Sequence, residues 1–311
     1  MDNEIKNKYI FIGGSGRSGT NIVKEILSKN SNVSSLNFEH RFTIDPDGII
    51  DFYNSFSLTW SPYMTDIKLK RLKSFLINLA KNRKSKKSYQ GWELDNHIPK
   101  YSKNVQMLVD ELKNFQYKCS WPGRIVDSSS YQLWFSKPYS KSELAKILGS
   151  FITTNFDSII KKNKKKIFVE DNTWNVLFAK EISELVPKSK MLHIIRDPRD
   201  VIASFVKQRW CPTDLQQAIF FYKSIFKRWF EIEKTLPDNY FSYVKLENLV
   251  SDRERYVNEI CIFVDLPFEN SMLKIDLSHS NQGRWEKDFS NEEKKIIGIE
   301  LAEILAWFNC H

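Results

Sequence analysis

The chain has 311 residues, 41% hydrophobic and 27% charged, and its 47 basic against 38 acidic residues give a formal net charge of +9. This composition excludes an extensively disordered chain and is typical of a globular protein with a sizeable core. The basic excess favours an anionic ligand or partner, although the lysine-rich run at 161–166 is more typical of a solvated surface. Nucleic acid is not expected, because no helix-turn-helix, zinc-finger or RNA-recognition signature occurs.

Cysteine spacing and hydropathy indicate in which cellular compartment the protein is expected. Its four cysteines lie far apart and form no CxxC pair, which argues against a zinc site and a disulfide framework. The sequence enters an apolar strand at residue 9, leaving no room for a signal peptide, and no apolar run is long enough to span a bilayer. We therefore expect a cytoplasmic protein without membrane insertion.

The first predicted element is a strand at 9–12, followed by a glycine-rich turn and a helix at 20–29. The turn, GSGRSGTN at 14–21, keeps the glycine spacing of the GxxxxGK[ST] phosphate loop but replaces the lysine by Thr20 and the hydroxyl residue by Asn21. Backbone N–H groups at a helix start can hold an anion without that lysine. The usual means of binding a γ-phosphate and its metal is missing, while Arg17 adds a guanidinium within the loop.

The stretch from 42 to 164 differs from its surroundings. It is rich in aromatic residues and lysine, has irregular periodicity, and is predicted to be a largely helical insertion over the carboxyl edge of a sheet. Its aromatic residues could line a ligand-binding cleft or form the insertion's own core. The residues concerned are Trp60, Tyr63, Trp92, Tyr101, Trp121 and Trp134.

After the insertion, short apolar strands alternate with helical patterns. Strands are predicted at 165–171, 190–197 and 240–249, and helices at 175–185, from 200, from 213 and at 291–308. This alternation indicates an α/β fold with a parallel sheet and helices on both faces. The glycine-rich loop would then lie at the carboxyl end of the first strand, where such sheets bind ligands.

A second candidate anion site is HIIRDPRDVIASF at 193–205. A strand ends before Arg196, a helix opens near Asp200, and Ser204 lies two turns after Arg196. The guanidinium of Arg196 and the hydroxyl of Ser204 could converge on one anion near the helix start. Alone, this motif could equally be a salt-bridged corner.

Together, the lysine-free loop and the Arg196/Ser204 pair resemble the PAPS-dependent sulfotransferases, whose donor is 3′-phosphoadenosine-5′-phosphosulfate (PAPS). In that family the first loop holds the 5′-phosphosulfate and the Arg/Ser pair holds the 3′-phosphate. Segments 243–268 and 283–293 are also similar to bacterial members, and GRSGTN followed by NFEHR is most similar to the tyrosylprotein and carbohydrate branch. The resemblance implies one P-loop-type α/β sulfotransferase domain over 1–311, with 42–164 on the acceptor side.

The resemblance implies a role for each matching residue. PAPS would be the co-substrate and PAP the product, with no metal. The donor-binding residues would be Gly16, Arg17, Ser18, Gly19, Thr20, Asn21, Arg196, Ser204 and Arg284. Arg17 would also stabilise the leaving 5′-phosphate, and Glu39 would be the general base, with His40 as its rival. Arg41 would bind the acceptor.

Two positions depart from the family pattern. The transition-state lysine expected ahead of the Arg/Ser strand is absent from Glu170-Asp171-Asn172-Thr173, so either a nearby lysine substitutes or this step is built differently. Leu246 stands where the family has a tyrosine near the adenine.

Two other functions stay open at this point. A P-loop kinase would need magnesium and ATP, and a non-catalytic nucleotide-binding module would keep Arg196 and Ser204 but tolerate loss of Glu39 or Arg17. The acceptor hydroxyl belongs to a sugar, a peptide tyrosine, a lipid or a small alcohol.

Overall fold

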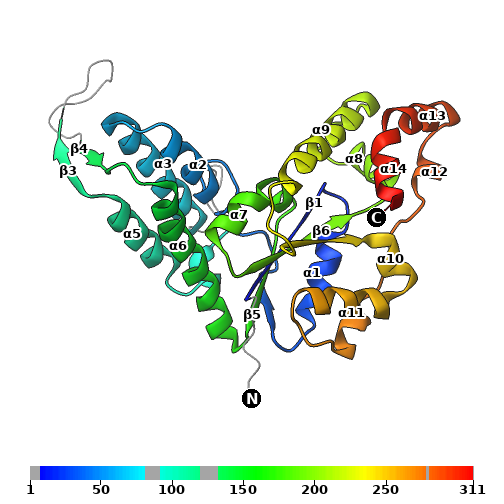
Figure 1. Ribbon diagram of the computed structural model, residues 1–311, viewed down its shortest axis with the longest axis horizontal. Coiled ribbons are helices and arrows are strands. Elements are labelled where there is room, and N and C mark those ends of the chain that lie inside the picture. The colour runs from blue at the N-terminus through cyan, green and yellow to red at the C-terminus, as the bar shows by residue number, and fades with distance from the viewer. Residues whose placement is uncertain (1–7, 81–91, 120–131, 278–279, 311) are drawn as a thin grey trace. The chain divides into compact units, whose positions relative to one another are not determined.

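The computed structural model describes residues 8–80, 92–119, 132–277 and 280–310. The chain divides into two compact units, which are described separately (Figure 1). The first unit consists of Met1–Glu39, Lys165–Ser183 and Pro187–His311, and the second of His40–Lys164 and Glu184–Val186. That the whole chain acts as one domain with an insertion at 42–164 stays a prediction.

The first unit is built on a five-stranded sheet with the order β2-β5-β1-β6-β7, in which every pairing is parallel. The strands are β1 (Tyr9–Gly14), β2 (Val33–Ser35), β5 (Ile167–Asp171), β6 (Ser189–Ile195) and β7 (Phe241–Lys245). Ile12 of β1 lies opposite Asp171 of β5 and Leu192 of β6, so these strands end at the same edge of the sheet. The predicted α/β fold is confirmed.

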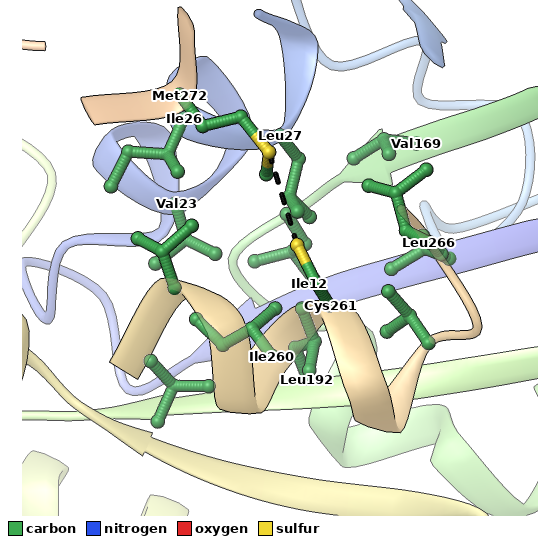
Figure 2. Packing of buried hydrophobic residues seen from close by; sticks show 14 of the residues in the cluster. Ile12, Val23, Ile26, Leu27, Val169, Leu192, Ile260, Cys261, Leu266 and Met272 are labelled. Atoms are coloured by element: carbon green, nitrogen blue, oxygen red, sulfur yellow. Dashed lines mark hydrogen bonds between the residues drawn. The ribbon is translucent and has the colours of Figure 1, made fainter. Parts of the chain in front are cut away.

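One face of the sheet is covered by α1 (Thr20–Ser28), α11 (Arg253–Phe263) and the 3₁₀ helix η2 (Asn270–Lys274). Because side chains alternate along a strand, Leu192 and Ile194 of β6 point to the same face and are completely buried there. Figure 2 shows this core, in which the Cys261 thiol lies 3.8 Å from the sulfur of Met272. The tight packing anchors α1, and with it the glycine-rich loop that precedes this helix.

On the other face, α8 (Pro198–Phe205), α9 (Leu215–Glu233), α13 (Asn291–Glu300) and α14 (Ala302–Cys310) share a second core (Figure 1). His193, which alternates with Leu192 and Ile194, meets Trp229 of α9 there at a ring-centroid distance of 4.3 Å. Burial lowers the pKa of His193 to about 3, so this histidine is a neutral core residue. Helices on both faces agree with the sequence prediction.

Several predicted boundaries need correction. The strand expected at 240–249 ends at Lys245, and α10 (Leu246–Ser251) follows, because Leu246 and Leu249 have the three-residue spacing of one buried helix face. The helix expected from 213 begins at Leu215, since the Asp214 side chain accepts a hydrogen bond from the N–H of Gln217 and caps the helix.

The other two corrections concern interrupted helices. The helix expected at 175–185 starts as the 3₁₀ helix η1 (Asn175–Phe178) and continues as α7 (Ala179–Leu185). The helix expected at 291–308 is broken at Leu301 into α13 and α14, because Leu301 leaves the helical conformation, with φ −103° and ψ 12°.

The second unit is largely helical, as predicted for 42–164. It contains α2 (Ile49–Leu58), α3 (Pro62–Ala80), α4 (Leu94–His97), α5 (Tyr101–Leu112), α6 (Lys141–Asn163) and the antiparallel hairpin of β3 (Phe115–Lys118) and β4 (Gln132–Phe135). Tyr101 is completely buried against Phe42 and Phe151, so it belongs to the core of this unit. Trp121 lies outside the described residues.

Candidate functional site

The glycine-rich loop joins β1 to α1 at the carboxyl edge of the sheet. Gly16, Arg17 and Gly19 all have positive φ angles, of 83°, 56° and 105°. This conformation is unusual for a side-chain-bearing residue such as Arg17, and runs of such turns form concave groups of backbone N–H donors that bind anions. Close packing adds to this constraint, because a Cβ atom at Gly16 would lie 2.8 Å from the Trp210 ring.

The start of α1 provides further donors to this loop. Gly19 caps the helix without a side-chain hydrogen bond, so no capping side chain serves the N–H groups of the first turn. The Ser18 hydroxyl is completely buried and, within the described parts of the chain, has no hydrogen-bond partner. An orphaned hydroxyl beside uncapped helix N–H groups fits an anionic ligand.

Arg196 links this loop to the second predicted anion site. It follows β6, and its guanidinium donates to the carbonyl oxygens of Arg17 at 3.3 Å and Asn281 at 2.7 Å. The guanidinium of Arg196 also forms an ion pair with the carboxylate of Asp200, with an N–O distance of 3.5 Å. Burial lowers the pKa of Arg196, and its buried Nε has no hydrogen-bond partner among the residues that the structure describes. A buried donor of this kind, without a partner in the described residues, would be satisfied by a bound anion.

Ser204 meets the loop directly. Its hydroxyl oxygen accepts a hydrogen bond from Arg17 Nε at 2.9 Å, although the two residues are 187 positions apart in the sequence. Ser204 is almost completely buried, whereas Arg17 is exposed. The predicted 5′ and 3′ anion sites are therefore neighbours, joined by this hydrogen bond and by the contact of Arg196 with the loop.

Asp200 organises the same region and is missing from the sequence prediction. It is completely buried, and its carboxylate accepts hydrogen bonds from the N–H groups of Gly283 at 2.8 Å and Trp285 at 3.1 Å. Its four-residue spacing from Arg196, typical of an ion pair along a helix, is the signal that could have revealed it. Asp200 thus fixes the segment that leads into α12 (Trp285–Asp288).

Arg284 lies in the segment that Asp200 holds. Its Nε is 2.9 Å from the carboxylate of Asp288, and its charge contributes to lowering the pKa of Arg196. The structure therefore brings four predicted donor-binding residues together: Arg17, Arg196, Ser204 and Arg284. Asn21, by contrast, is an exposed residue in the first turn of α1.

Glu39 follows β2 and faces the end of β5. Its Oε1 accepts weak hydrogen bonds from the backbone N–H of Thr173 at 3.4 Å and from the Thr173 hydroxyl at 3.5 Å. Burial raises the pKa of Glu170 well above its ordinary value and also raises the pKa of Asp171, and the negative charge of Glu39 adds to both shifts. Three carboxyl groups therefore influence one another beside the loop.

Lys24 of α1 supplies a positive charge to this group. Its Nζ lies 3.3 Å from Asp171, and both side chains are largely buried. The ammonium of Lys24 and the hydroxyl of Thr20 both act to lower the pKa of Asp171, against the larger effect of burial. Lys24 therefore stands at the 170–173 segment, where the family resemblance expects a lysine.

Replacing Lys24 by methionine should lower the free energy of unfolding by about 3 kcal/mol, because a buried ion pair then loses one partner. Without Lys24 the pKa of Asp171 rises further. A carboxyl whose pKa is higher in the folded than in the unfolded state loses its stabilising contribution as pH increases through the folded-state pKa. The decrease in the free energy of unfolding caused by Lys24→Met should therefore be larger at about pH 8 than at about pH 5. Urea denaturation at both pH values measures it. Lys29→Met, at an exposed lysine directly after the same helix, is the control, and a pH-independent loss would contradict this account.

His40 and Arg41 belong to the second unit. His40 is buried and stacks on Phe42 at a centroid distance of 3.9 Å, and burial, with the nearby charge of Arg41, lowers its pKa to about 3. Arg41 lies 3.6 Å from Asp45 and near the ring of Trp92, with its guanidinium carbon 5.9 Å from the ring centroid. An imidazole with so low a pKa is a poor proton acceptor near neutral pH.

The described residues contain no group of three or more His, Cys, Asp or Glu side chains placed to hold a metal ion. Among the helices in the described ranges, none has both the length and the apolar character needed to cross a membrane.

A family model described as "Sulfotransferase family" matches residues 9–270. None of the curated proteins compared matches the chain.

Solved structures also resemble the chain. The sulfotransferase domain of the Synechococcus PCC 7002 olefin synthase is 15% identical, with a TM-score of 0.48 and coverage of 98% of this chain and 97% of that domain. Sulfotransferase STF1 from Mycobacterium tuberculosis H37Rv is 13% identical, with a TM-score of 0.48 and coverage of 96% and 77%. A retinol dehydratase in complex with androsterone and PAP is 13% identical, with a TM-score of 0.37 and coverage of 95% and 80%.

Proposed function

Because the chain belongs to the sulfotransferase family, and is therefore a transferase, we propose that it moves a sulfuryl group from PAPS to an acceptor hydroxyl. The observation that carries this proposal is the hydrogen bond of 2.9 Å between Arg17 Nε and Ser204 Oγ, with Arg196 donating to the carbonyl of Arg17. The loop and the Arg196/Ser204 pair, predicted anion sites from distant parts of the sequence, thereby form one basic cluster of Arg17, Arg196 and Ser204. A donor with phosphate groups at both its 5′ and 3′ positions matches such a cluster.

The chain's polar groups divide between the two ends of this donor. The loop N–H groups, the Ser18 hydroxyl and Arg17 would hold the 5′-phosphosulfate. The Nε of Arg196, the Ser204 hydroxyl and Arg284 would hold the 3′-phosphate. The buried, unsatisfied donors at Ser18 and Arg196 within the described structure fit this use, because binding would satisfy both.

The reaction is an in-line displacement at sulfur. The acceptor oxygen forms a bond to sulfur, the bond between sulfur and the bridging oxygen of the 5′-phosphate breaks, and the acceptor proton passes to the Glu39 carboxylate. The products are a sulfate ester and PAP. Arg17 would stabilise the negative charge that develops on the departing phosphate, which is typically a large contribution to catalysis.

Glu39 suits the base better than His40 does. Thr173 holds the Glu39 carboxylate through its N–H and hydroxyl, whereas the pKa of His40 is lowered to about 3 within its own core. The ammonium of Lys24 would supply the positive charge that the missing family lysine provides elsewhere. Arg41 as an acceptor-binding residue, and 42–164 as an acceptor-side insertion of one domain over 1–311, remain parts of this proposal.

Calorimetric titration with PAP in the absence of magnesium tests the proposal. PAP should bind at least about 100-fold more tightly than 5′-AMP, because only PAP offers a phosphate to Arg196 and Ser204. Equal affinities for the two nucleotides would contradict the 3′-phosphate site. Binding of ATP that requires magnesium would favour the P-loop kinase instead.

A further inference from the structure

A second surface of the first unit is apolar, in contrast to the charged basic cluster. It is an open pocket of about 430 Å³ with a mostly apolar accessible surface, at the start of α9. Its lining residues are Pro212, Gln216, Gln217, Phe220, Phe221 and Ser224. Phe220 is 74% exposed, a large apolar surface for a residue in the first turns of a well-packed helix. The volume lies within the range of small-molecule sites.

Aromatic side chains connect this pocket to the candidate catalytic residues. Phe221 in the pocket wall meets Trp174 edge-on at 6.1 Å between ring centroids, and Trp174 meets Trp210 in the same manner at 6.2 Å. Trp210 in turn covers Gly16, where a Cβ atom would lie 2.8 Å from its ring. Trp174 directly follows Thr173, whose N–H and hydroxyl hold Glu39. Phe221, Trp174 and Trp210 therefore form a row of neighbouring aromatic rings, an aromatic wall, between the pocket and the loop.

The aromatic wall and the basic cluster both lie beside the loop, but they suit ligands of different chemistry. Arg17, Arg196 and Ser204 provide charged and hydroxyl donors suited to the anionic groups of a nucleotide. The accessible surface of the pocket is mostly apolar, although Gln216, Gln217 and Ser224 are among its lining residues. A sugar would gain little from contact with such a surface. An alkyl chain or an aromatic ring would gain from burial.

We propose that this pocket holds the apolar body of the acceptor, so that the acceptor is an alcohol with an alkyl or aryl group attached. The inference rests on the proposed sulfotransferase function and specifies its acceptor class. The hydroxyl would lie at the Glu39 end of the wall, and the apolar body would extend along Trp174 and Phe221 toward Phe220. The residues that line this pocket all belong to the first unit.

The test measures sulfuryl transfer from PAPS to four alcohols, ethanol, 1-butanol, 1-hexanol and 1-octanol. The rate is determined from the release of PAP. In the unmodified protein kcat/KM should rise by up to about fourfold for each methylene that enters the pocket. Phe220→Gln should flatten this dependence, and Phe220→Leu should keep most of it. Ile262→Gln, at a similarly exposed residue of α11, should leave it unchanged. The affinity for PAP should be the same in all variants.

Other results would overturn the proposal. A flat dependence on chain length in the unmodified protein, with sulfation of a sugar or a tyrosine peptide, would assign the acceptor to another class while leaving the proposed function intact. Weaker PAP binding by Phe220→Gln would show that the pocket holds part of the donor. A dimer in sedimentation that is lost in Phe220→Gln would make the pocket an interface between copies. Failure of PAP to bind would overturn the proposed function, and this inference with it.

Discussion

Replacing Glu39 by glutamine should lower kcat for sulfuryl transfer about 1,000-fold, within the range attributed to general acid–base catalysis. The amide keeps the size of the side chain and can still accept hydrogen bonds from Thr173, but it no longer removes the acceptor proton. Glu39 does not belong to the proposed basic cluster, so the dissociation constant for PAP should change less than about twofold. Steady-state PAP release measures the first quantity and calorimetry the second.

Two further variants separate a chemical role for Glu39 from a structural one. Glu39→Asp retains a carboxylate and should recover part of the rate, because the group remains basic but is displaced from its position. Glu254→Gln, at an exposed glutamate on α11, should leave the rate unchanged. A Glu39→Gln protein with normal kcat would eliminate Glu39 as the base. A non-catalytic module would show no turnover for any variant to lose.

Most of the fold follows from local sequence signals. Short apolar segments such as 9–12 and 190–195 alternate with amphipathic helices, and this pattern specifies a parallel sheet with helices on both faces. The errors occur where the pattern is ambiguous. The apolar residues of 240–249 fit a strand and a helix equally well, and in the structure the strand ends at Lys245, after which Leu246 packs beside Gly19.

The site is less readable from the sequence than the fold. The loop and the Arg196/Ser204 pair are recognisable because each is a contiguous motif with fixed spacing. The contact of Arg17 with Ser204 spans 187 positions and arises from the register of β1 and β6, which composition does not reveal. Lys24 and Trp210 have no motif of their own, so only the arrangement of α1 brings Lys24 to Asp171, and only the 206–214 segment brings Trp210 to Gly16.

Replacing Arg196 by alanine should weaken PAP binding about 100-fold and 5′-AMP binding by less than about threefold. The buried guanidinium provides a charge-assisted donor, Nε, that within the described residues has no protein partner, and only PAP carries the 3′-phosphate that would use it. The ratio of the two dissociation constants is the decisive quantity. Loss of the Arg196 contacts to Arg17 and Asn281 would disturb the loop for both nucleotides and would cancel in that ratio.

Arg199 provides a matched control within the same motif. Its guanidinium pairs with Asp197 at 2.6 Å and lies over the Trp285 ring at 4.0 Å, so its hydrogen bonds go to Asp197. Arg199→Ala should therefore leave the PAP to AMP ratio unchanged. Ser204→Ala should lower PAP affinity about tenfold, because a neutral hydroxyl contributes less than a guanidinium. Equal losses for PAP and AMP in Arg196→Ala would place the 3′-phosphate elsewhere and would reduce Arg196 to a residue that supports the loop.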